Sequence, residues 1–163
     1  MKKFELTNEF ITNMFGTKLF RIRALVEFGD VEAGELGGYV EKESNLGHDD
    51  NAWVYDNAWV YGNAWVYGDA QVSGDARVYD NAWVYGDAQV SGDARVYGNA
   101  RVYGNAWVYG NAWVYGNAWV YGNALVCSDE DYAYAHGFGS VNRTTTFFRL
   151  KDGGVGVRCG CFY

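Results

Sequence analysis

Histidine and cysteine are the side chains that most often do acid–base, nucleophilic or metal chemistry, and this sequence has few of them. The two histidines are His48 and His136. A general base needs a partner that orients it and a pocket that holds the substrate. His136 lies in Ala135-His136-Gly137-Phe138-Gly139, with no acidic residue within a few positions. We take His136 as the sole candidate for catalysis, expect it to be a surface or capping residue, and predict no catalytic site.

The cysteines and acidic residues do not form a recognisable metal site. Cys159 and Cys161 are two positions apart on an expected strand, so their side chains point to the same side. Structural zinc sites use four ligands, and no further pair accompanies them. The recurring Asn and Asp residues (Asn57, Asp75, Asp93) lack the nonapeptide calcium motif, and their place at turns explains them. We therefore predict no metal and no cofactor.

Most aromatic side chains lie in a repeat that fills the middle of the chain. Residues 51–128 are thirteen consecutive hexapeptides of the form [N/D]-A-x-V-[Y/S/C]-[G/D/S]. Every copy has Ala second and Val fourth, from Ala52 and Val54 to Ala124 and Val126. Self-similarity at a fixed period indicates a repeat architecture and overrides a window-by-window interpretation.

Each hexapeptide predicts a short strand followed by a corner. In Ala-x-Val-Tyr the Ala and Val side chains point to one face, and the variable residue and Tyr point to the other. The following Gly accepts positive φ freely, and Asn and Asp tolerate it better than other residues, so these positions predict the corner. A helix is disfavoured because a six-residue period drifts against 3.6 residues per turn and each unit contains Val and Gly.

The repeat also predicts the number of sides. Residues 63–80 and 81–98 are almost identical, which is a period of 18 residues or three hexapeptides. Residues 18 apart therefore occupy equivalent positions on successive coils of a triangular prism, whose narrow interior is filled by Val and Ala. The absence of proline suits a fold in which nearly every N–H joins a ladder.

The outward positions sort into three rows. The first row is Trp53, Gln71, Gln89, Trp107 and Leu125; the second is Trp59, Arg77, Arg95 and Trp113; the third is Trp65, Trp83, Arg101 and Trp119. Tyrosines accompany the second row (Tyr61, Tyr79, Tyr97, Tyr115) and the third (Tyr67, Tyr85, Tyr103, Tyr121).

Two interpretations of these rows stay open. Stacked aromatic residues on parallel strands stabilise a sheet without any ligand. A large exposed aromatic surface also marks an interface, and Trp, Tyr and Arg are enriched at binding hot spots. We predict partner binding by Trp59, Arg77, Arg95, Trp113, Tyr61, Tyr79, Tyr97, Tyr115, Trp65, Trp83, Arg101 and Trp119. Sugars or bases stacked on the rows are a further alternative.

The flanks predict caps on a single domain. Residues 1–35 form an N-terminal cap containing a strand at 18–26, and residues 36–134 form the β-helix, with Leu36 in the Val column and Val40 in the Ala column. Residues 135–163 form a C-terminal hairpin from Thr144 to Phe162, with its turn at 152–154. A β-helix needs such caps because an open end exposes unpaired backbone.

The charge and composition of the chain limit which partners and which cellular compartment we expect. The net charge is −7 and no segment is basic, so nucleic acid is not expected as the main partner. No signal peptide or membrane helix is predicted. Three cysteines do not make a closed disulfide framework, which indicates a reducing cytoplasm.

The repeat resembles the left-handed β-helix of the hexapeptide-repeat superfamily, which has an aliphatic residue at i and a small residue at i+4, as in Val54 with Ala58. The flanking motifs are Arg21-Ile22-Arg23-Ala24-Leu25, Leu36-Gly37-Gly38-Tyr39-Val40-Glu41, Thr146-Phe147-Phe148-Arg149 and Cys159-Gly160-Cys161-Phe162. They are similar to an uncharacterised prophage and gut-bacterial branch labelled polymer-forming or acyltransferase-like. The resemblance implies left-handed coiling. The expected fold is all-β: a three-sided left-handed parallel β-helix with an N-terminal cap and a C-terminal β-hairpin.

We expect a non-catalytic, phage-type binding scaffold in the cytoplasm of a bacterial host. Its partner is a protein, such as a host defence component or host enzyme that it inhibits. Two alternatives stay open. The resemblance implies an acyltransferase-like enzyme, but such enzymes use a histidine base between subunits, and residues 51–128 contain neither histidine nor insertion. The other alternative is self-assembly, as a dimer, a trimer or an end-to-end stack.

Overall fold

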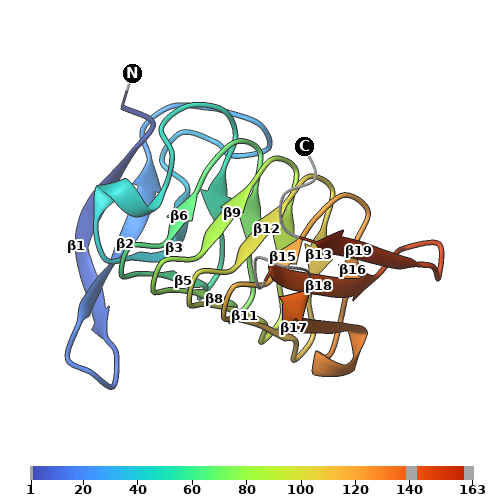
Figure 1. Cartoon of the computed structure of the whole chain (residues 1–163). Helices are drawn as coiled ribbons and strands as arrows, with labels where there is room; N and C mark the ends of the chain where they lie inside the picture. The colour runs from blue at the N-terminus through green and yellow to red at the C-terminus, as the bar shows by residue number, and fades with distance from the viewer. Residues whose placement is uncertain (1, 139–142, 160–163) are drawn as a thin grey trace.

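The computed structural model describes residues 2–138 and 143–159 and shows an all-β chain built around a stack of parallel coils (Figure 1). Strands 18 residues apart pair in register, as in Val54 with Val72 and Val60 with Val78. The predicted parallel β-helix with three sides is confirmed.

The first side holds β4 (Trp53–Val54), β7 (Gln71–Val72), β10 (Gln89–Val90), β13 (Trp107–Val108) and β16 (Leu125–Val126). The second holds β5 (Trp59–Val60), β8 (Arg77–Val78), β11 (Arg95–Val96) and β14 (Trp113–Val114); the third holds β6 (Trp65–Val66), β9 (Trp83–Tyr85), β12 (Arg101–Tyr103) and β15 (Trp119–Val120).

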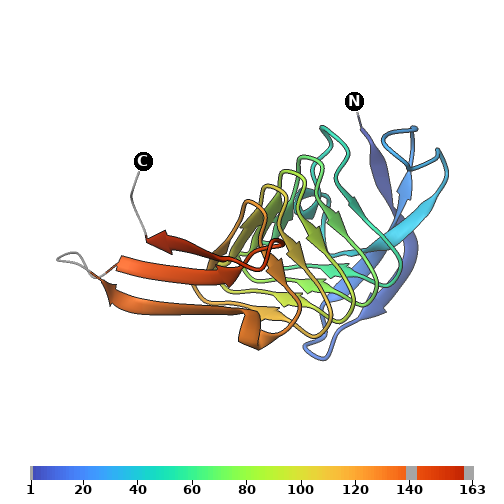
Figure 2. The ribbon, with the colours of Figure 1, turned by 90° about the vertical axis from the view of Figure 1, so that its right-hand side faces the viewer.

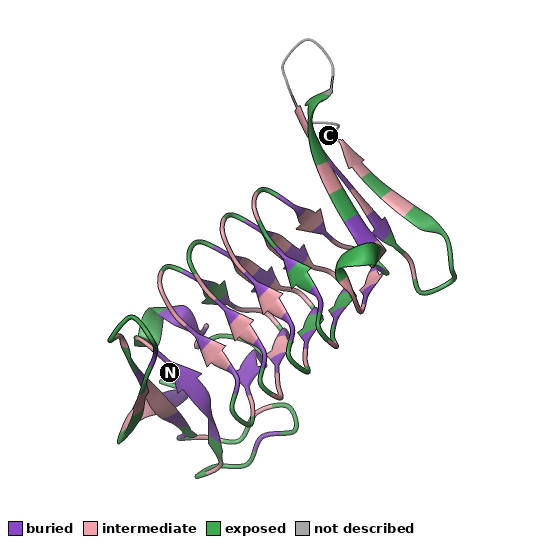
Figure 3. Ribbon diagram, turned by 90° about the horizontal axis from the view of Figure 1, so that it is seen from below, coloured by how far each residue is buried: buried purple, intermediate pink, exposed green. Residues whose placement is uncertain are grey.

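The interior of the coils is built from the two invariant columns. Every Val from Val54 to Val126 and every Ala from Ala52 to Ala124 is at most 1% exposed. Burial alternates along each coil, so inward and outward residues follow one another (Figure 3). Each buried Val stabilises the fold by about 2 kcal/mol before chain entropy is subtracted.

Positive φ angles turn the chain at each corner, as predicted. The corner glycines from Gly62 to Gly122 have φ between 63° and 71°. Asp56 and Asp80 take the same position with φ of 53° and 60°, which agrees with the tolerance of Asp for this region. At Gly98 an added Cβ would lie 3.0 Å from the Gly116 nitrogen of the next coil. The corner thus combines an unfavourable φ with close backbone packing.

Replacing Gly98 separates these two causes. We expect Gly98→Val to lower the free energy of unfolding by about 1–2 kcal/mol, because a β-branched residue resists positive φ. Gly98→Asn adds a Cβ at the same place but tolerates the angle, so its loss is smaller. Urea unfolding of both variants measures the difference, and equal losses would assign the whole effect to packing instead of φ.

The outward-facing residues of each coil donate their backbone N–H groups to the coil that follows. The N–H of Trp53 donates to the carbonyl of Ala70 at 3.1 Å, and that of Arg77 donates to Ala94 at 2.9 Å. These outward N–H groups point toward the C-terminal end of the stack, and the inward Ala and Val carbonyls that accept them point toward its N-terminal end. Since buried backbone groups need partners, the caps must supply donors for these carbonyls at the N-terminal end, the acceptor end, and acceptors for these N–H groups at the C-terminal end, the donor end.

The N-terminal cap supplies hydrogen-bond donors. Strands β1 (Phe4–Thr12), β2 (Lys18–Ala24) and β3 (Leu36–Val40) extend the second sheet; β3 pairs antiparallel with β2 and parallel with β5. A short 3-10 turn, η1 (Glu43–Asn45), follows. Lys3 Nζ donates to the carbonyl of Ala52, and Asn45 Nδ2 donates to that of Ala64, both at 2.8 Å. The acceptor end of the stack is thereby occupied by an ammonium and an amide.

Two sequence-based expectations at this end need correction. Leu36 was expected in the Val column and Val40 in the Ala column. Instead Val40 pairs with Val60 and is fully buried, while Leu36 pairs with Arg23 and is 48% exposed. The segment between β3 and the first regular coil breaks the 18-residue count, so Val40 lies 20 residues before its partner.

The C-terminal cap supplies acceptors. It consists of η2 (Asp129–Asp131) and an antiparallel sheet of β17 (Tyr132–Phe138), β18 (Arg143–Arg149) and β19 (Val155–Cys159), which projects from the stack (Figure 2). The Trp113 N–H donates to Asp129 Oδ1 at 2.7 Å, and the Trp119 N–H donates to Thr146 Oγ1 at 3.0 Å. Side-chain oxygens thus replace the carbonyls of a further coil.

The predicted C-terminal hairpin is present, with its turn between β18 and β19. The Gly153 N–H donates to the carbonyl of Leu150 at 3.0 Å. Strand β17 joins the hairpin as a third strand, and the end of the expected segment, 160–162, lies outside the described residues. Within the described ranges no helix is long and apolar enough to cross a membrane.

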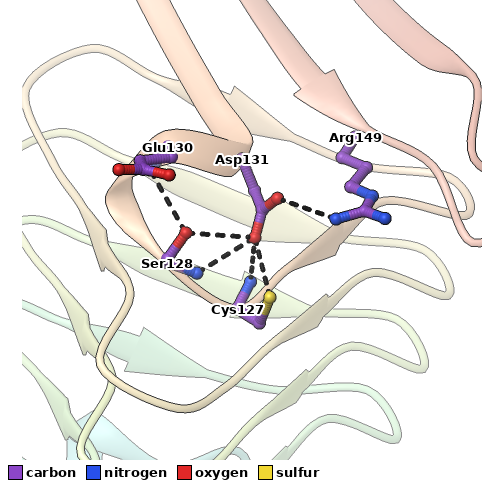
Figure 4. A network of polar contacts seen from close by, with 5 residues as sticks. All are labelled: Cys127, Ser128, Glu130, Asp131 and Arg149. Atoms are coloured by element: carbon purple, nitrogen blue, oxygen red, sulfur yellow. Dashed lines mark hydrogen bonds and ion pairs between the residues drawn. The ribbon is translucent and has the colours of Figure 1, made fainter.

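Asp131 ties the last coil to this cap (Figure 4). Its carboxylate accepts the Cys127 N–H at 2.9 Å and the Cys127 thiol at 2.8 Å, and it pairs with Arg149 at 3.3 Å. It also accepts the Ser128 N–H at 3.1 Å. Burial by itself raises the pKa of this carboxyl, but the hydrogen bonds outweigh burial and lower the pKa to about 2. The ionised form is therefore favoured by folding.

Replacing Asp131 tests the cap. We expect Asp131→Ala to lower the free energy of unfolding at neutral pH by about 1–3 kcal/mol, because it leaves several donors without their acceptor. The Asp131 contribution is present above the unfolded pKa of about 4 and is lost as pH falls toward 2. Urea unfolding of wild type should show this acid loss and the variant should lack it.

The matched control is Glu130→Ala, whose side chain is exposed beside Asp131. It should change stability by less than about 0.5 kcal/mol. A loss equal to that of Asp131→Ala would mean that turn propensity, and not the carboxylate network, holds the cap.

Candidate functional site

Two faces of the coil stack carry continuous tyrosine ladders, as the rows predict. On the second face the rings of Tyr61, Tyr79, Tyr97 and Tyr115 stack with centroids 5.0, 4.9 and 5.3 Å apart and interplanar angles of at most 13°. On the third face the rings of Tyr67, Tyr85, Tyr103 and Tyr121 stack at 4.9, 4.8 and 5.2 Å. Each ring packs against its neighbours, so the rings form one continuous stack on each face.

The arginines of both rows lie over tryptophan rings. On the second face Arg77 lies 4.2 Å from the centroid of Trp59, and Arg95 lies 4.7 Å from that of Trp113. On the third face Arg101 lies between Trp83 at 4.6 Å and Trp119 at 4.7 Å. Such cation–π contacts are worth about 0.5–1 kcal/mol at exposed sites and fix the direction of each guanidinium.

The second face is the more open of the two. Trp113 and Tyr115 are each 39% exposed there, whereas the exposed large residue of the third face is Trp65, also at 39%. The C-terminal sheet covers the third row at its far end, where Arg158 lies 4.4 Å from the centroid of Trp119. The open strip of the second face runs from Trp59 and Arg77, which line a hollow of about 210 Å³ with Tyr39, to Trp113 and Tyr115.

Comparison with known protein families identifies the coils as a known type of repeat. A family model described as YdcK Beta solenoid repeat matches residues 51–68, 70–86, 88–104, 94–110, 100–116 and 106–122. The chain is a β-helix repeat protein. The matched residues all lie within the hexapeptide repeats, and they form the stacked coils of the structure. No curated protein matches the chain.

The two histidines lie at opposite ends of the β-helix protein. His136 is exposed on β17, with its Nδ1 2.8 Å from Thr144 Oγ1 and its ring edge-on to Tyr134. His48 stacks on Phe4 in the N-terminal cap, and burial lowers its pKa. Neither ring contacts a carboxylate among the described residues, and the Lys3 N–H donates to His48 Nδ1 at 3.2 Å.

Metal ligands are not assembled in the part of the chain that the structure describes. No group of three or more His, Cys, Asp or Glu residues there is placed to hold an ion. Cys159 is half-buried on β19, and Cys161 lies outside the described residues.

The first face differs from the other two, and none of its residues was predicted to bind a partner. Trp53 is fully buried there because the N-terminal cap covers it, with Phe28 edge-on at 5.3 Å. Farther along this face lies a hollow of about 470 Å³. It is lined by Gln89, Ser91, Trp107, Tyr109 and Leu125. The signal in the sequence was the repeated DAQVSG hexapeptide, which interrupts the aromatic columns at Gln71, Ser73, Gln89 and Ser91.

Burial changes the acidity of Tyr79 within the second-face ladder. Burial, and then the neighbouring Tyr61 and Tyr97, raises the pKa of Tyr79 to about 12. The neutral phenol is therefore favoured by folding. Its stabilising contribution is complete below the unfolded pKa of about 10 and is lost as pH rises through 12.

A pH series tests this ladder. We expect the urea midpoint of wild type to fall between pH 10 and 12 and that of Tyr79→Phe to fall less, because Phe stacks but does not titrate. The same variant at pH 7 controls for the lost hydroxyl. Parallel curves for both proteins over the alkaline range would contradict the coupling of Tyr79 ionisation to folding.

Proposed function

We propose that this β-helix protein is a non-catalytic binding scaffold that docks a protein partner on its second face. The observation that supports the proposal is the open strip of Trp, Tyr and Arg there, held in place by stacked rings and cation–π contacts. These three residue types dominate binding hot spots. A pre-ordered surface also loses little side-chain entropy on association.

The arginines of this strip are available to a partner. Neither Arg77 nor Arg95 forms an ion pair or side-chain hydrogen bond with another described residue, although each guanidinium lies over a tryptophan ring. Stacking leaves the N–H edges of a guanidinium free to pair with carboxylates or carbonyl oxygens. A partner with acidic or carbonyl-rich protrusions and an apolar centre would complement this face.

The specific form that we propose is a phage-encoded inhibitor of a host defence component or host enzyme, acting in the bacterial cytoplasm. The resemblance of both flanks to prophage hexapeptide proteins motivates it, as does the absence of histidine from residues 51–128. Binding to a second copy on the same face is the competing form. End-to-end stacking is disfavoured because Trp113 and Trp119 already have acceptors at the donor end.

The decisive variant is Trp113→Ala combined with Arg95→Ala. Both side chains lie outside the Ala and Val core, so the fold should persist while the strip loses one of its two most exposed rings and the guanidinium over it. We expect a tagged pull-down from bacterial lysate, read by mass spectrometry, to recover a stoichiometric partner with wild type. Recovery should fall at least about tenfold with the double variant, as loss of hot-spot residues implies.

The matched control is Trp65→Ala with Arg101→Ala, which makes the same substitutions on the third face. It should bind normally, and circular dichroism should show that all three proteins are folded. Normal binding by the Trp113/Arg95 variant would exclude the second face. If wild type recovers only itself, light scattering of the two variants identifies which face joins the copies.

A further inference from the structure

The first face carries polar side chains where the other two faces carry rings. In its second and third coils, Gln71 and Gln89 occupy the Trp column, and Ser73 and Ser91 occupy the Tyr column. The next coil restores aromatic residues with Trp107 and Tyr109. Ser91 lacks the ring that Tyr109 carries one coil later. The space left beside the Tyr109 ring is part of a hollow of about 470 Å³.

Two exposed rings form a wall of this hollow. Trp107 is 42% exposed and Tyr109 is 37% exposed, although Lys151 Nζ lies 3.9 Å from the centroid of the Trp107 ring. Leu125 of the last coil completes the apolar side of the lining. The volume is within the range of about 300–1,000 Å³ typical of small-molecule sites.

The polar groups beside this wall are not used within the protein. A ladder of amide hydrogen bonds joins Asn63, Asn81, Asn99 and Asn117 at 3.1–3.3 Å. By contrast, the side chains of Gln71, Gln89, Ser73 and Ser91 form no hydrogen bond with any residue that the structure describes. Their amides and hydroxyls are therefore open to water or to a ligand, both as donors and as acceptors.

The chemistry of the lining selects among ligand classes. The five lining residues include no charged side chain, and the Lys151 ammonium beside them lies over the Trp107 ring, so the lining itself favours a neutral ligand over a phosphate. A pyranose ring fits this combination, because its C–H face packs on an aromatic ring while its hydroxyls exchange hydrogen bonds with amides and hydroxyls.

The polar surface is also repeated. Residues 69–74 and 87–92 are the same hexapeptide, DAQVSG, so Gln71 and Ser73 present the same groups one coil before Gln89 and Ser91. Successive coils are about 4.8 Å apart, which is close to the length of one sugar unit in an extended chain. A ligand built from repeating units would meet equivalent groups at each step.

We propose that the first face binds a neutral oligosaccharide. One sugar ring packs against Trp107 and Tyr109 with its hydroxyls on Gln89 and Ser91, and the next unit lies over Gln71 and Ser73. This site is separate from the protein-docking second face and does not depend on it.

Isothermal titration calorimetry of the whole chain tests the site. The probes are cellohexaose, maltohexaose and hexa-N-acetylchitohexaose, which differ in linkage geometry and in the acetamido group. We expect at least one probe to bind saturably at micromolar to millimolar concentration. Trp107→Ala should weaken that binding at least about tenfold, and Gln89→Ala, which leaves both rings in place, should weaken it several-fold.

Two controls separate this proposal from others. Trp65→Ala removes a ring of similar exposure from the third face and should bind the probe as wild type does. The Trp113/Arg95 double variant should also bind normally, so failure of the second-face proposal leaves this test intact. The proposal is overturned if wild type binds none of the three probes at millimolar concentration, or if Gln89→Ala and Trp107→Ala bind as tightly as wild type.

Discussion

The outward residues of each coil donate their backbone N–H groups to inward Ala and Val carbonyls of the next coil, so the first coil leaves carbonyls and the last coil leaves N–H groups for the caps to satisfy. Lys3 and Asn45 donate to the first coil, whereas Asp129, Asp131 and Thr146 accept from the last coils. The caps are thus chemically complementary to the ends that they cover. Covering the ends excludes water from the Ala and Val columns, and the outward rows depend on the regular coils that result.

The sequence predicted what is periodic and missed what occurs once. The coil length, the three sides and the corner positions follow from a repeat in which every copy confirms the others. The contact between Lys3 and Ala52 joins residues 49 positions apart, and Lys3 lies outside the repeat, so the periodicity could not predict it. The burial of Trp53 had the same cause: its outward position was predicted, but the cap over it was not. The sequence did contain the signal for the first-face hollow. Gln71 and Gln89 were placed correctly in the first row, but the absence of aromatic rings at these positions was not interpreted as a hollow.

The invariant core and the variable surface are independent of one another. Ala and Val fill the interior in every coil, so the residue between them can change from Trp to Arg, Gln or Leu without altering the coil. The second face uses this freedom for stacked rings and guanidinium groups, and the first face uses it for unpaired amides and hydroxyls. One backbone thereby presents two surfaces of different chemistry at fixed spacing, and the stacked rings of the second face leave little side-chain entropy to lose when it is covered.

The near-identity of residues 63–80 and 81–98 has a consequence for how such a chain can change in length. Unequal recombination between two such blocks adds or removes 18 residues, a whole coil, and leaves each row on its own face and each cap against its own end. A change of one hexapeptide would instead rotate everything after it by one side of the prism. The C-terminal cap would then meet the wrong face, and Trp and Gln would exchange rows. The gene can therefore lengthen the outward faces of the stack one coil at a time, and a step of 18 residues keeps each row on its face.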